Sequence, residues 1–402
     1  MKVLIADRFD AAAIESLKSA GCDVALRTEL TADDLPQTLA EHRPNVLIVR
    51  STRVNAKALA ATDRLALIVR AGSGTESIDV AEASRRGVSV ANTPGRNATA
   101  VAELVWGLIL ACDRRIPDQI EDLRAGKWNR AEYVRAQGLF GKTLGIVGFG
   151  RVGREVAARG QAFGMRVIAW SPSLTEEQCD AAGVDYVANL SNLARLADVV
   201  SVSVASTAAT DGLIGERFLS AMRVGATLVN TSRSSVIDEQ ALAKAVVDRQ
   251  LRCGLDVFEG EPPSGVGSFN NPLAHNRSVY GTHHVGASTE QAHRATSAEA
   301  ARIVLAFVDG GTIPNCVNRA AATPATAVLT VRHLNRPGVL AHIFYTLGQA
   351  QINVEEMENV IYEGGEAGCA KVHLSRPPSE EHIVTIRKNP NVLGTVLTLI
   401  KR

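Results

Sequence analysis

Short runs of apolar residues alternate with helical patterns along most of the chain. In the first part, residues 11–20 have a helical pattern, and the apolar runs lie at 3–6, 46–49, 65–69 and 88–91. Short, unbroken apolar runs of this kind are typical of parallel strands that are covered on both faces. The pattern therefore predicts an open, doubly wound α/β sheet.

A second series of the same kind begins after a long helical pattern at 98–112. Its apolar runs lie at 144–147, 167–170, 199–204, 227–229 and 253–257, and a helical pattern at 288–308 closes the region. The series predicts a second doubly wound parallel sheet of the Rossmann or flavodoxin-like type.

The last part of the chain has a different order of elements. Composition changes at Gly310-Gly311 and again at 320–324, which predicts a linker. Residues 325–402 then follow the order β-α-β-β-α-β, with strands expected at 327–331, 354–362 and 370–374. That order predicts a ferredoxin-like α+β domain. Three domains are reasonable for 402 residues, since one domain takes roughly 100–200 residues.

Charge and composition exclude several classes of protein. Lys and Arg number 43 and Asp and Glu 42, so the net charge of +1 argues against binding to nucleic acid or to membrane surfaces. The six cysteines are scattered without a CxxC pair, as expected for reduced thiols of a cytosolic protein. No signal-peptide pattern and no apolar run of about 20 residues is present, so the cytoplasm is the expected location.

The strongest local motif is a glycine loop after the apolar run at 144–147. Gly148, Gly150 and Gly153 form the pattern GxGxxG, and helical sequence follows directly. The first glycine permits a tight turn, the second lets a pyrophosphate approach the backbone, and the third lets helix and strand pack closely. The motif alone is weak, but between a strand and a helix it predicts a dinucleotide site.

The residue after the next strand bears on which dinucleotide is bound. A carboxylate usually binds the adenosine ribose at that point, but here residues 166–170 are followed by Ser171. Serine does not repel a 2′-phosphate, although no Arg or Lys follows at once to attract one. We therefore predict NAD with relaxed selectivity, which leaves NADP open.

Three later loops carry an arginine, a glutamate and a histidine that together suit one reaction. Arg233, Glu261 and His284 lie in loops that are expected at the carboxyl ends of parallel strands, where α/β sheets bind ligands. A histidine can exchange the proton of a substrate hydroxyl, a carboxylate can orient its ring, and an arginine can bind a substrate carboxylate through two hydrogen bonds. The set predicts hydride transfer to or from a small 2-hydroxy acid.

Each of these residues also has a simpler interpretation. Arg233 could be a surface ion-pair partner, and Glu261 could be a solvated loop acid. His283 and His284 could bind a metal, but no matching cluster of Cys, His and acidic residues accompanies them, so we predict no metal site.

With these residues in place, nearly the whole chain resembles the D-isomer-specific 2-hydroxyacid dehydrogenase family. The resemblance lies in the segments VLIVRSTRV (46–54), RAGSGTESIDV (70–80), ANTPGRNATAVAEL (91–104), AGKWNR (125–130), GKTLGIVGFGRVGREVA (141–157), NTSRSSVIDEQAL (230–242), GLDVFEGEP (254–262) and GTHHVGAST (281–289). It implies that Arg233 binds the substrate carboxylate and carbonyl, that His284 is the proton donor and acceptor, and that Glu261 pairs with His284.

The same resemblance implies the residues around the catalytic set. The cofactor site is expected to include Gly148, Gly150, Arg151, Val152, Gly153, Ser171, Thr231, Asp256, Gly286 and Ala287. Substrate contacts are expected from Arg50, Ser51, Arg70, Ser73, Gly74, Arg130 and Arg233, and Arg53 could help to bind a phosphate.

The resemblance further implies a discontinuous domain and an oligomer. Residues 1–96 and 288–320 would form the substrate-binding domain, residues 97–287 the NAD-binding domain, and 325–402 a third domain. A homodimer or homotetramer is expected, with Arg130 near the active site of the partner. The sequence departs from the family at several positions, which affects the expected substrate fit: Ser203, Ala205, Ser234, His283 and the pair Glu76-Ser77.

Residues 325–402 resemble an ACT domain, a regulatory module that binds amino acids. The segment 333–340 (HLNRPGVL) and the segment 351–353 (QIN) carry this resemblance. It implies that His333, Asn335 and Asn353 bind L-serine as an effector between paired domains. The alternative is a structural dimerisation module whose polar residues cap turns.

Within the family, the resemblance is to enzymes that oxidise 3-phosphoglycerate to 3-phosphohydroxypyruvate in serine synthesis. The ACT resemblance and the arginines at 50, 53 and 70 favour this phosphorylated hydroxy acid. A reductase of glyoxylate or hydroxypyruvate, or another D-2-hydroxyacid dehydrogenase, is a close alternative. A nucleotide-sensing corepressor or scaffold on the same fold is an alternative of a different class.

Overall fold

The computed structural model describes residues 1–262, 265–320 and 322–400. The chain divides into two compact units, Met1–Asn318 and Arg319–Arg402. The boundary lies beside the predicted linker at 320–324, of which residue 321 is outside the described residues. None of the described helices has the length and apolar composition that a helix crossing a bilayer needs.

The first sheet of the larger unit is entirely parallel and has the flavodoxin-like strand order β2-β1-β3-β4-β5. Its strands are β1 (Lys2–Ile5), β2 (Asp23–Leu26), β3 (Val46–Val49), β4 (Leu67–Arg70) and β5 (Ser89–Asn92). The crossover helices are α1 (Ala11–Ser19), α2 (Leu35–His42), α3 (Ala56–Ala60) and α4 (Val80–Arg85).

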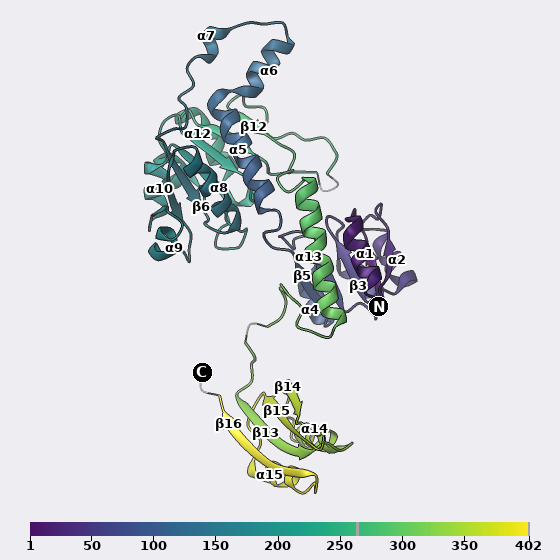
Figure 1. Cartoon of the computed structure of the whole chain (residues 1–402). Helices are drawn as coiled ribbons and strands as arrows, with labels where there is room; N and C mark the ends of the chain where they lie inside the picture. Colours follow the sequence, from purple (N-terminus) through teal and green to yellow (C-terminus); the bar gives the residue numbers. More distant parts are fainter. Residues whose placement is uncertain (263–264, 321, 401–402) are drawn as a thin grey trace. The chain divides into compact units, whose positions relative to one another are not determined.

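Both faces of this first sheet are covered. Leu35, Leu39 and Leu59 from α2 and α3 pack on one face. The other face is covered by α1 and by α13 (Glu290–Val308), a helix from much later in the chain, whose Ile303 and Val304 are fully buried. Figure 1 shows α13 beside α1. The return of α13 makes this part of the structure discontinuous in sequence.

The second sheet contains seven parallel strands in the order β12-β11-β10-β9-β6-β7-β8, the Rossmann arrangement with one strand added. Its strands are β6 (Thr143–Val147), β7 (Arg166–Trp170), β8 (Asp185–Tyr186), β9 (Val199–Val202), β10 (Thr227–Asn230), β11 (Arg252–Leu255) and β12 (Val279–Gly281). Its helices are α5 (Ala98–Arg114), α6 (Ile116–Arg124), α7 (Arg130–Tyr133), α8 (Arg151–Ala162), α9 (Glu176–Asp180), α10 (Leu190–Leu196), α11 (Glu216–Ala221) and α12 (Glu239–Asp248), with a 3-10 turn at Ser234–Val236.

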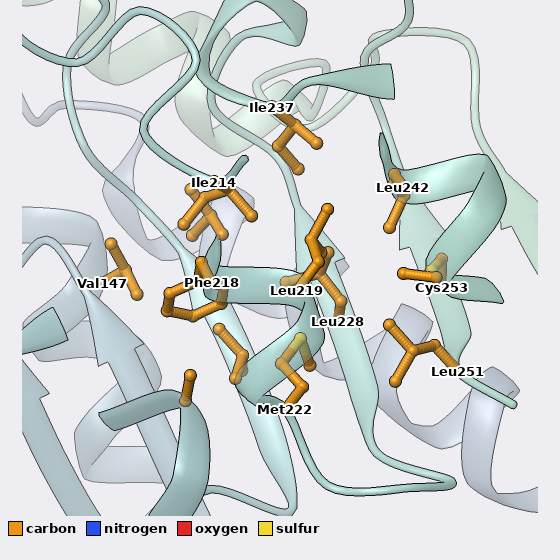
Figure 2. Packing of buried hydrophobic residues seen from close by; sticks show 14 of the residues in the cluster. Val147, Ile214, Phe218, Leu219, Met222, Leu228, Ile237, Leu242, Leu251 and Cys253 are labelled. Carbon is orange, nitrogen blue, oxygen red and sulfur yellow. The ribbon is translucent and has the colours of Figure 1, made fainter. Parts of the chain in front are cut away.

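Two hydrophobic clusters hold this second sheet between its helices. On one face α5 and α8 contribute Val105, Ile109 and Val156 against Leu144 and Ile146 of β6. The cluster on the other face is drawn in Figure 2, where side chains of α11 and α12 converge on the sheet. Each fully buried Leu or Ile side chain contributes roughly 1.5–3 kcal/mol through burial, so the two clusters fix the sheet and the loops at its ends.

The smaller unit has the predicted element order β-α-β-β-α-β. It consists of β13 (Ala327–Leu334), α14 (Val339–Gln349), β14 (Val354–Ile361), β15 (Ala367–Leu374), α15 (Glu380–Arg387) and β16 (Val392–Leu399). The strands form an antiparallel sheet in the order β14-β15-β13-β16. Alternate residues of β13 are buried in a core with α14 and α15, as the two-residue period of a half-covered strand requires.

The predicted parallel sheets are confirmed, and the apolar runs coincide with strands to within about one residue at most ends. Three short strands were not predicted: β2, β8 and β12. β2 and β8 are edge strands with largely exposed side chains, and β12 has only three residues. None of the three therefore carries the apolar run that marks a central strand.

Candidate active site

A cavity of about 550 Å³ lies at the carboxyl ends of the parallel strands, where segments that follow β4 and β5 meet loops of the second sheet. Ligand sites of open α/β sheets occur at this edge. The lining residues are Arg70, Ser73, Gly74, Thr75, Glu76, Gly95, Asn97, Val101, Arg151, Val152, Ser203, Val204, Ala205, Ser206, Thr231, Ser232, Arg233, Asp256, His284, Gly286 and Ala287.

His284 and Glu261 form the predicted pair. The Nδ1 atom of His284 lies 2.8 Å from Oε2 of Glu261, and Oε1 of Glu261 accepts a hydrogen bond of 2.8 Å from the backbone N–H of Phe258. A carboxylate accepts only, so Nδ1 carries a hydrogen and Nε2 is left to exchange a proton. His284 lines the cavity, which puts this exchange where a ligand can reach it.

The pair shifts both pKa values in directions that suit acid–base chemistry. The hydrogen bond that His284 donates to Glu261 raises the pKa of His284 above its ordinary value, although burial opposes the shift. Burial acts to raise the pKa of Glu261, but the hydrogen bonds from His284 and Phe258 hold that pKa below its ordinary value. Glu261 thus stays ionised while His284 changes charge.

Asp256 holds the loop on which His284 lies. Its carboxylate is buried and accepts hydrogen bonds from the Thr282 hydroxyl at 2.6 Å and from the backbone N–H groups of Val285 and Gly286 at 2.9 Å. The backbone carbonyl of Asp256 also accepts the N–H of His284 at 2.9 Å. These bonds hold His284 in the left-handed region, at a φ of 53°, which a residue of this type adopts rarely.

Arg233 lies in the loop after β10 and is also oriented by its neighbours. The side chain of the buried Asn230 donates to the carbonyl of Arg233 at 3.0 Å and accepts from Ser232. Arg233 Nη1 donates to the carbonyl of Ser232 at 2.7 Å, and its Nε donates to Glu76 at 3.1 Å. His284 and Arg233 line one cavity.

The three glycines of the GxGxxG loop occupy the environments expected of them. Gly148 has a φ of 99°, and a β-carbon there would lie 2.7 Å from backbone atoms of residues 203 and 204. A β-carbon at Gly153 would collide with the carbonyl oxygen of Gly148. Gly150 has open space where its side chain would be, and it begins α8 without a side-chain cap. The first N–H groups of α8 are thus left for an anionic ligand.

Two buried hydroxyl groups support the fit of a dinucleotide in this cavity. The Oγ1 of Thr231 and the Oγ of Ser203 have no hydrogen-bond partner among the described residues, and both residues line the cavity. Buried polar atoms are seldom left unpaired. Together with the open Gly150, they leave hydrogen-bonding capacity of the kind that a nicotinamide cofactor would use.

Other predicted cofactor residues differ in their surroundings. Arg151, Val152, Gly286 and Ala287 line the cavity, and Arg151 Nη1 donates to the carbonyl of Pro94. Ser171 follows β7 outside the cavity lining.

The predicted substrate residues fall into two groups. Arg70, Ser73, Gly74 and Arg233 line the cavity. Arg50 and Ser51 do not: their backbone N–H groups donate to the carboxylate of Asp7, which also accepts the Ser51 hydroxyl at 2.7 Å. Sequence reasoning did not single out Asp7, although an acid directly after a buried strand is a signal for this edge of the sheet.

The sequence did not indicate several of the lining residues, notably Thr75, Asn97, Ser206 and Ser232. Asn97 accepts the Ser73 hydroxyl at 2.9 Å. Glu76 was noted only as a departure from the family, yet it contacts Arg233. Small polar residues in loops give no signal of their own, because their positions depend on how the two sheets meet.

Arg130 lies at the start of α7, away from the cavity lining. Among the described residues, no group of three or more His, Cys, Asp or Glu side chains is arranged to hold a metal ion. In the same described part of the chain, all six cysteines are free thiols.

The predicted effector residues do not meet within one chain. His333 lies near the end of β13 beside Gly368, whereas Asn353 precedes β14 at the end of the sheet near Leu374. His333 is buried, donates from Nδ1 to the carbonyl of Leu334 at 2.8 Å, and has Nε2 2.9 Å from the Asn359 amide. Asn335 donates to the carbonyl of Gly365. A site that uses all three predicted residues therefore requires a second copy.

Comparison with known proteins places these observations in a family. Residues 106–286 match the family model described as D-isomer specific 2-hydroxyacid dehydrogenase, NAD binding domain. The chain is 40% identical over 272 residues to hydroxypyruvate reductase from Thermotoga maritima, covering 67% of this chain and 86% of that protein. It is 37% identical over 320 residues to D-3-phosphoglycerate dehydrogenase from Methanocaldococcus jannaschii, covering 79% of this chain and 59% of that protein.

A solved structure agrees with these relatives. The NAD⁺-bound 3-phosphoglycerate dehydrogenase of Entamoeba histolytica superposes with a TM-score of 0.66 at 26% identity, covering 79% of this chain and 99% of that one. The chain spans only about three fifths of the length of the phosphoglycerate dehydrogenase that it matches. Its second sheet carries the NAD-binding domain, and the chain belongs to the D-isomer specific 2-hydroxyacid dehydrogenase family.

Proposed function

We propose that this protein oxidises 3-phospho-D-glycerate to 3-phosphohydroxypyruvate with NAD, a step that leads to L-serine. The observation that carries the proposal is that His284, bonded to Glu261 at 2.8 Å, lines the same cavity as Arg233. These groups match the needs of a 2-hydroxy acid, which carries a carboxylate next to the hydroxyl that loses its proton.

The residues divide the work as follows. Arg233 binds the substrate carboxylate through two parallel hydrogen bonds. His284 Nε2 takes the proton of the C2 hydroxyl as the C2 hydride leaves, and Glu261 stabilises the resulting imidazolium. NAD, when bound, supplies the hydride acceptor. Asp256 keeps the histidine loop in place during the proton transfer.

The phosphorylated substrate is supported by charge and by relatives. Arg70 and Arg233 line the cavity, and Arg50 and Arg53 follow β3 at the same edge of the first sheet. Several similar proteins are phosphoglycerate dehydrogenases. Hydroxypyruvate or glyoxylate reduction is the second candidate, because the Thermotoga relative is a hydroxypyruvate reductase and is covered over 86% of its length.

A panel of substrates with both cofactors tests the proposal. We expect turnover of 3-phosphoglycerate with NAD to exceed that of unphosphorylated hydroxy acids, with only a modest preference for NAD over NADP because Ser171 replaces the usual acid. Faster reduction of hydroxypyruvate or glyoxylate would favour the second candidate. A wild-type protein that is inactive on every hydroxy acid and oxo acid would favour a nucleotide-sensing corepressor or scaffold.

Changing Glu261 to glutamine is expected to shift the pH dependence of the reaction. Oxidation requires neutral His284, so its kcat/KM falls at low pH as His284 is protonated. The carboxylate raises the pKa of His284, so its removal lowers that pKa and moves the acid limb to lower pH. The maximal rate should fall about tenfold or more, because no carboxylate then stabilises the protonated ring of His284. Profiles of kcat/KM from about pH 5 to about pH 9 measure this shift.

An acid limb that stays at the wild-type pH in Glu261→Gln would contradict the assigned role. Glu259→Gln is a suitable control, because Glu259 lies in the same loop, whereas the carboxylate bonded to His284 is that of Glu261.

We also propose that two copies of the chain associate through α6 and the segment after it. α6 contains no buried residue, and the exposed fractions of Leu123, Trp128 and Phe140 are 56%, 83% and 88%. Large apolar side chains gathered on one segment are typical of an interface. The proposal also explains why Arg130, in this segment, lies outside its own cavity: it would serve the partner.

The double variant Leu123→Glu/Trp128→Glu is expected to be a monomer at micromolar concentration, because two charges would be buried in the interface. Light scattering coupled to size exclusion measures the mass. Val247→Glu is the matched control, since Val247 is 70% exposed on α12 outside the segment, and it should leave the mass unchanged. A double variant with the wild-type mass would place the interface elsewhere.

We propose that residues 325–402 act as an ACT domain that binds L-serine between two copies. Asn335 of one copy and Asn353 of another would share the ligand, because these residues lie at opposite ends of one sheet. Inhibition requires that serine bind one conformational state better than the other. The purely structural dimerisation module remains the alternative.

Calorimetry with the full-length oligomer tests the effector proposal. L-serine should give a binding isotherm with the wild type and none with Asn353→Ala, while D-serine serves as the ligand control. A wild-type oligomer that gives no heat with L-serine would favour the structural module. The division into a substrate-binding domain (1–96 and 288–320) and a coenzyme domain (97–287), and the cytoplasmic location, remain predictions.

A further inference from the structure

The carboxylate of Glu76 occupies one edge of the Arg233 guanidinium. Glu76 Oε1 lies 3.1 Å from both Nε and Nη2 of Arg233. The remaining nitrogen, Nη1, donates to the carbonyl of Ser232 at 2.7 Å. The Nε–Nη2 edge can form two parallel hydrogen bonds with a carboxylate. In this structure Oε1 of Glu76 is the partner of both Nε and Nη2.

The surroundings of Glu76 resemble a site for an anion. Arg70 lines the same cavity, and its positive charge acts on Glu76 together with that of Arg233. Arg70 Nε is buried and has no hydrogen-bond partner among the described residues. A β-carbon at Gly74 would collide with Glu76 Oε2 and would lie 2.7 Å from Arg233 Nη2, so Gly74 leaves the room for this contact.

We propose that Glu76 is a specificity-determining residue, which holds the carboxylate-binding edge of Arg233 until the carboxylate of the substrate displaces it. The inference rests on the proposed function, in which Arg233 binds the substrate. Two substrate oxygens can accept two separate hydrogen bonds, whereas Glu76 offers one oxygen to both donors. A ligand without a carboxylate cannot displace Glu76, so Arg233 stays paired with Glu76.

The expected effect of Glu76 on carboxylate binding follows from the solvent exposure of the ion pair. The side chains of Arg233 and Glu76 are 35% and 59% exposed, so the pair is screened by solvent. Exposed ion pairs of this kind change an equilibrium by about two- to fivefold. Removing the Glu76 charge should therefore tighten the binding of a carboxylate by about that factor.

The test measures binding without turnover. Oxamate, a carboxylate that resembles a 2-oxo acid, is titrated by calorimetry into the full chain saturated with NADH. Glu76→Gln keeps the size of the side chain and removes its charge, and Glu76→Ala removes the side chain. Both are expected to bind oxamate about two- to fivefold more tightly than the wild type. Glu216→Gln, which removes an exposed carboxylate paired with Lys244 outside the cavity, should leave the affinity unchanged.

Oxamate affinity that is unchanged or weaker in both Glu76 variants would overturn the inference, because Glu76 would then not compete for Arg233. This outcome is separate from a failure of the proposed function. A wild type without turnover whose Glu76 variants still bind oxamate more tightly would reject the reaction and retain the role of Glu76. Melting temperatures of the variants, measured alongside, verify that each is folded.

Discussion

Replacing His284 by alanine is expected to lower kcat/KM for the hydroxy acid by about 10²–10⁴-fold, the usual contribution of a positioned acid–base group. The imidazole is held by Glu261 at 2.8 Å and by the loop bonds of Asp256, so the substitution removes a positioned proton acceptor. The loss should appear mainly in kcat, because the proton is transferred in the transition state. Steady-state rates with saturating NAD measure it.

The neighbouring histidine provides a matched control. His283 is exposed and does not line the cavity, so His283→Ala should keep nearly the wild-type rate. The affinity for NADH, followed by its fluorescence, should be similar in both variants, which shows that the His284 loop is still folded. If His284→Ala kept full activity while His283→Ala lost it, the proton acceptor would have been assigned to the wrong residue.

Replacing Arg233 by lysine is expected to raise KM for the hydroxy acid by roughly 10- to 150-fold. Lysine keeps the positive charge but cannot present two parallel donors to a carboxylate. The loss of one charge-assisted hydrogen bond costs about 1.5–3 kcal/mol, which corresponds to that change in affinity. The loop should remain folded, because Asn230 binds the backbone carbonyl of residue 233 rather than its side chain.

Arg166→Lys is the control for this substitution, since Arg166 pairs with Asp185 at 2.6 Å outside the cavity and both side chains are largely exposed. It should leave KM unchanged. A wild-type KM for Arg233→Lys would mean that charge alone binds the substrate, and the two-bond geometry would have no part in recognition.

The sequence predicted the central strands and the loops between them better than the set of residues that share the cavity. The apolar runs marked the central strands, and the chain order then put Arg233, Glu261 and His284 in loops at one edge of the sheet. Gly148 and Gly153 also have the environments that the motif predicts, although the backbone that crowds Gly148 comes from residues 203 and 204, far along the chain. By contrast, the Arg50 and Ser51 segment binds Asp7, a partner that lies 43 or 44 positions earlier in the chain.

The effector residues show the same limit. His333 and Asn353 were singled out by their resemblance to ACT-domain positions, and β13 and β14 place them at opposite ends of one antiparallel sheet. The side-chain partner of the His333 ring is instead Asn359, which the sequence did not single out. Spacing along the chain does not give the strand order, and the strand order decides which ends meet.

By itself, the sequence determined the alternation of strands and helices, the dinucleotide loop and the types of acid–base side chain, because each depends on residues that are close in the chain. The tertiary structure decided which side chains share the cavity. It brings α13 back to the first sheet, places His284 in a left-handed turn held by Asp256, and puts Glu76 against Arg233. These contacts join residues far apart in sequence, so they depend on how the sheets and loops pack.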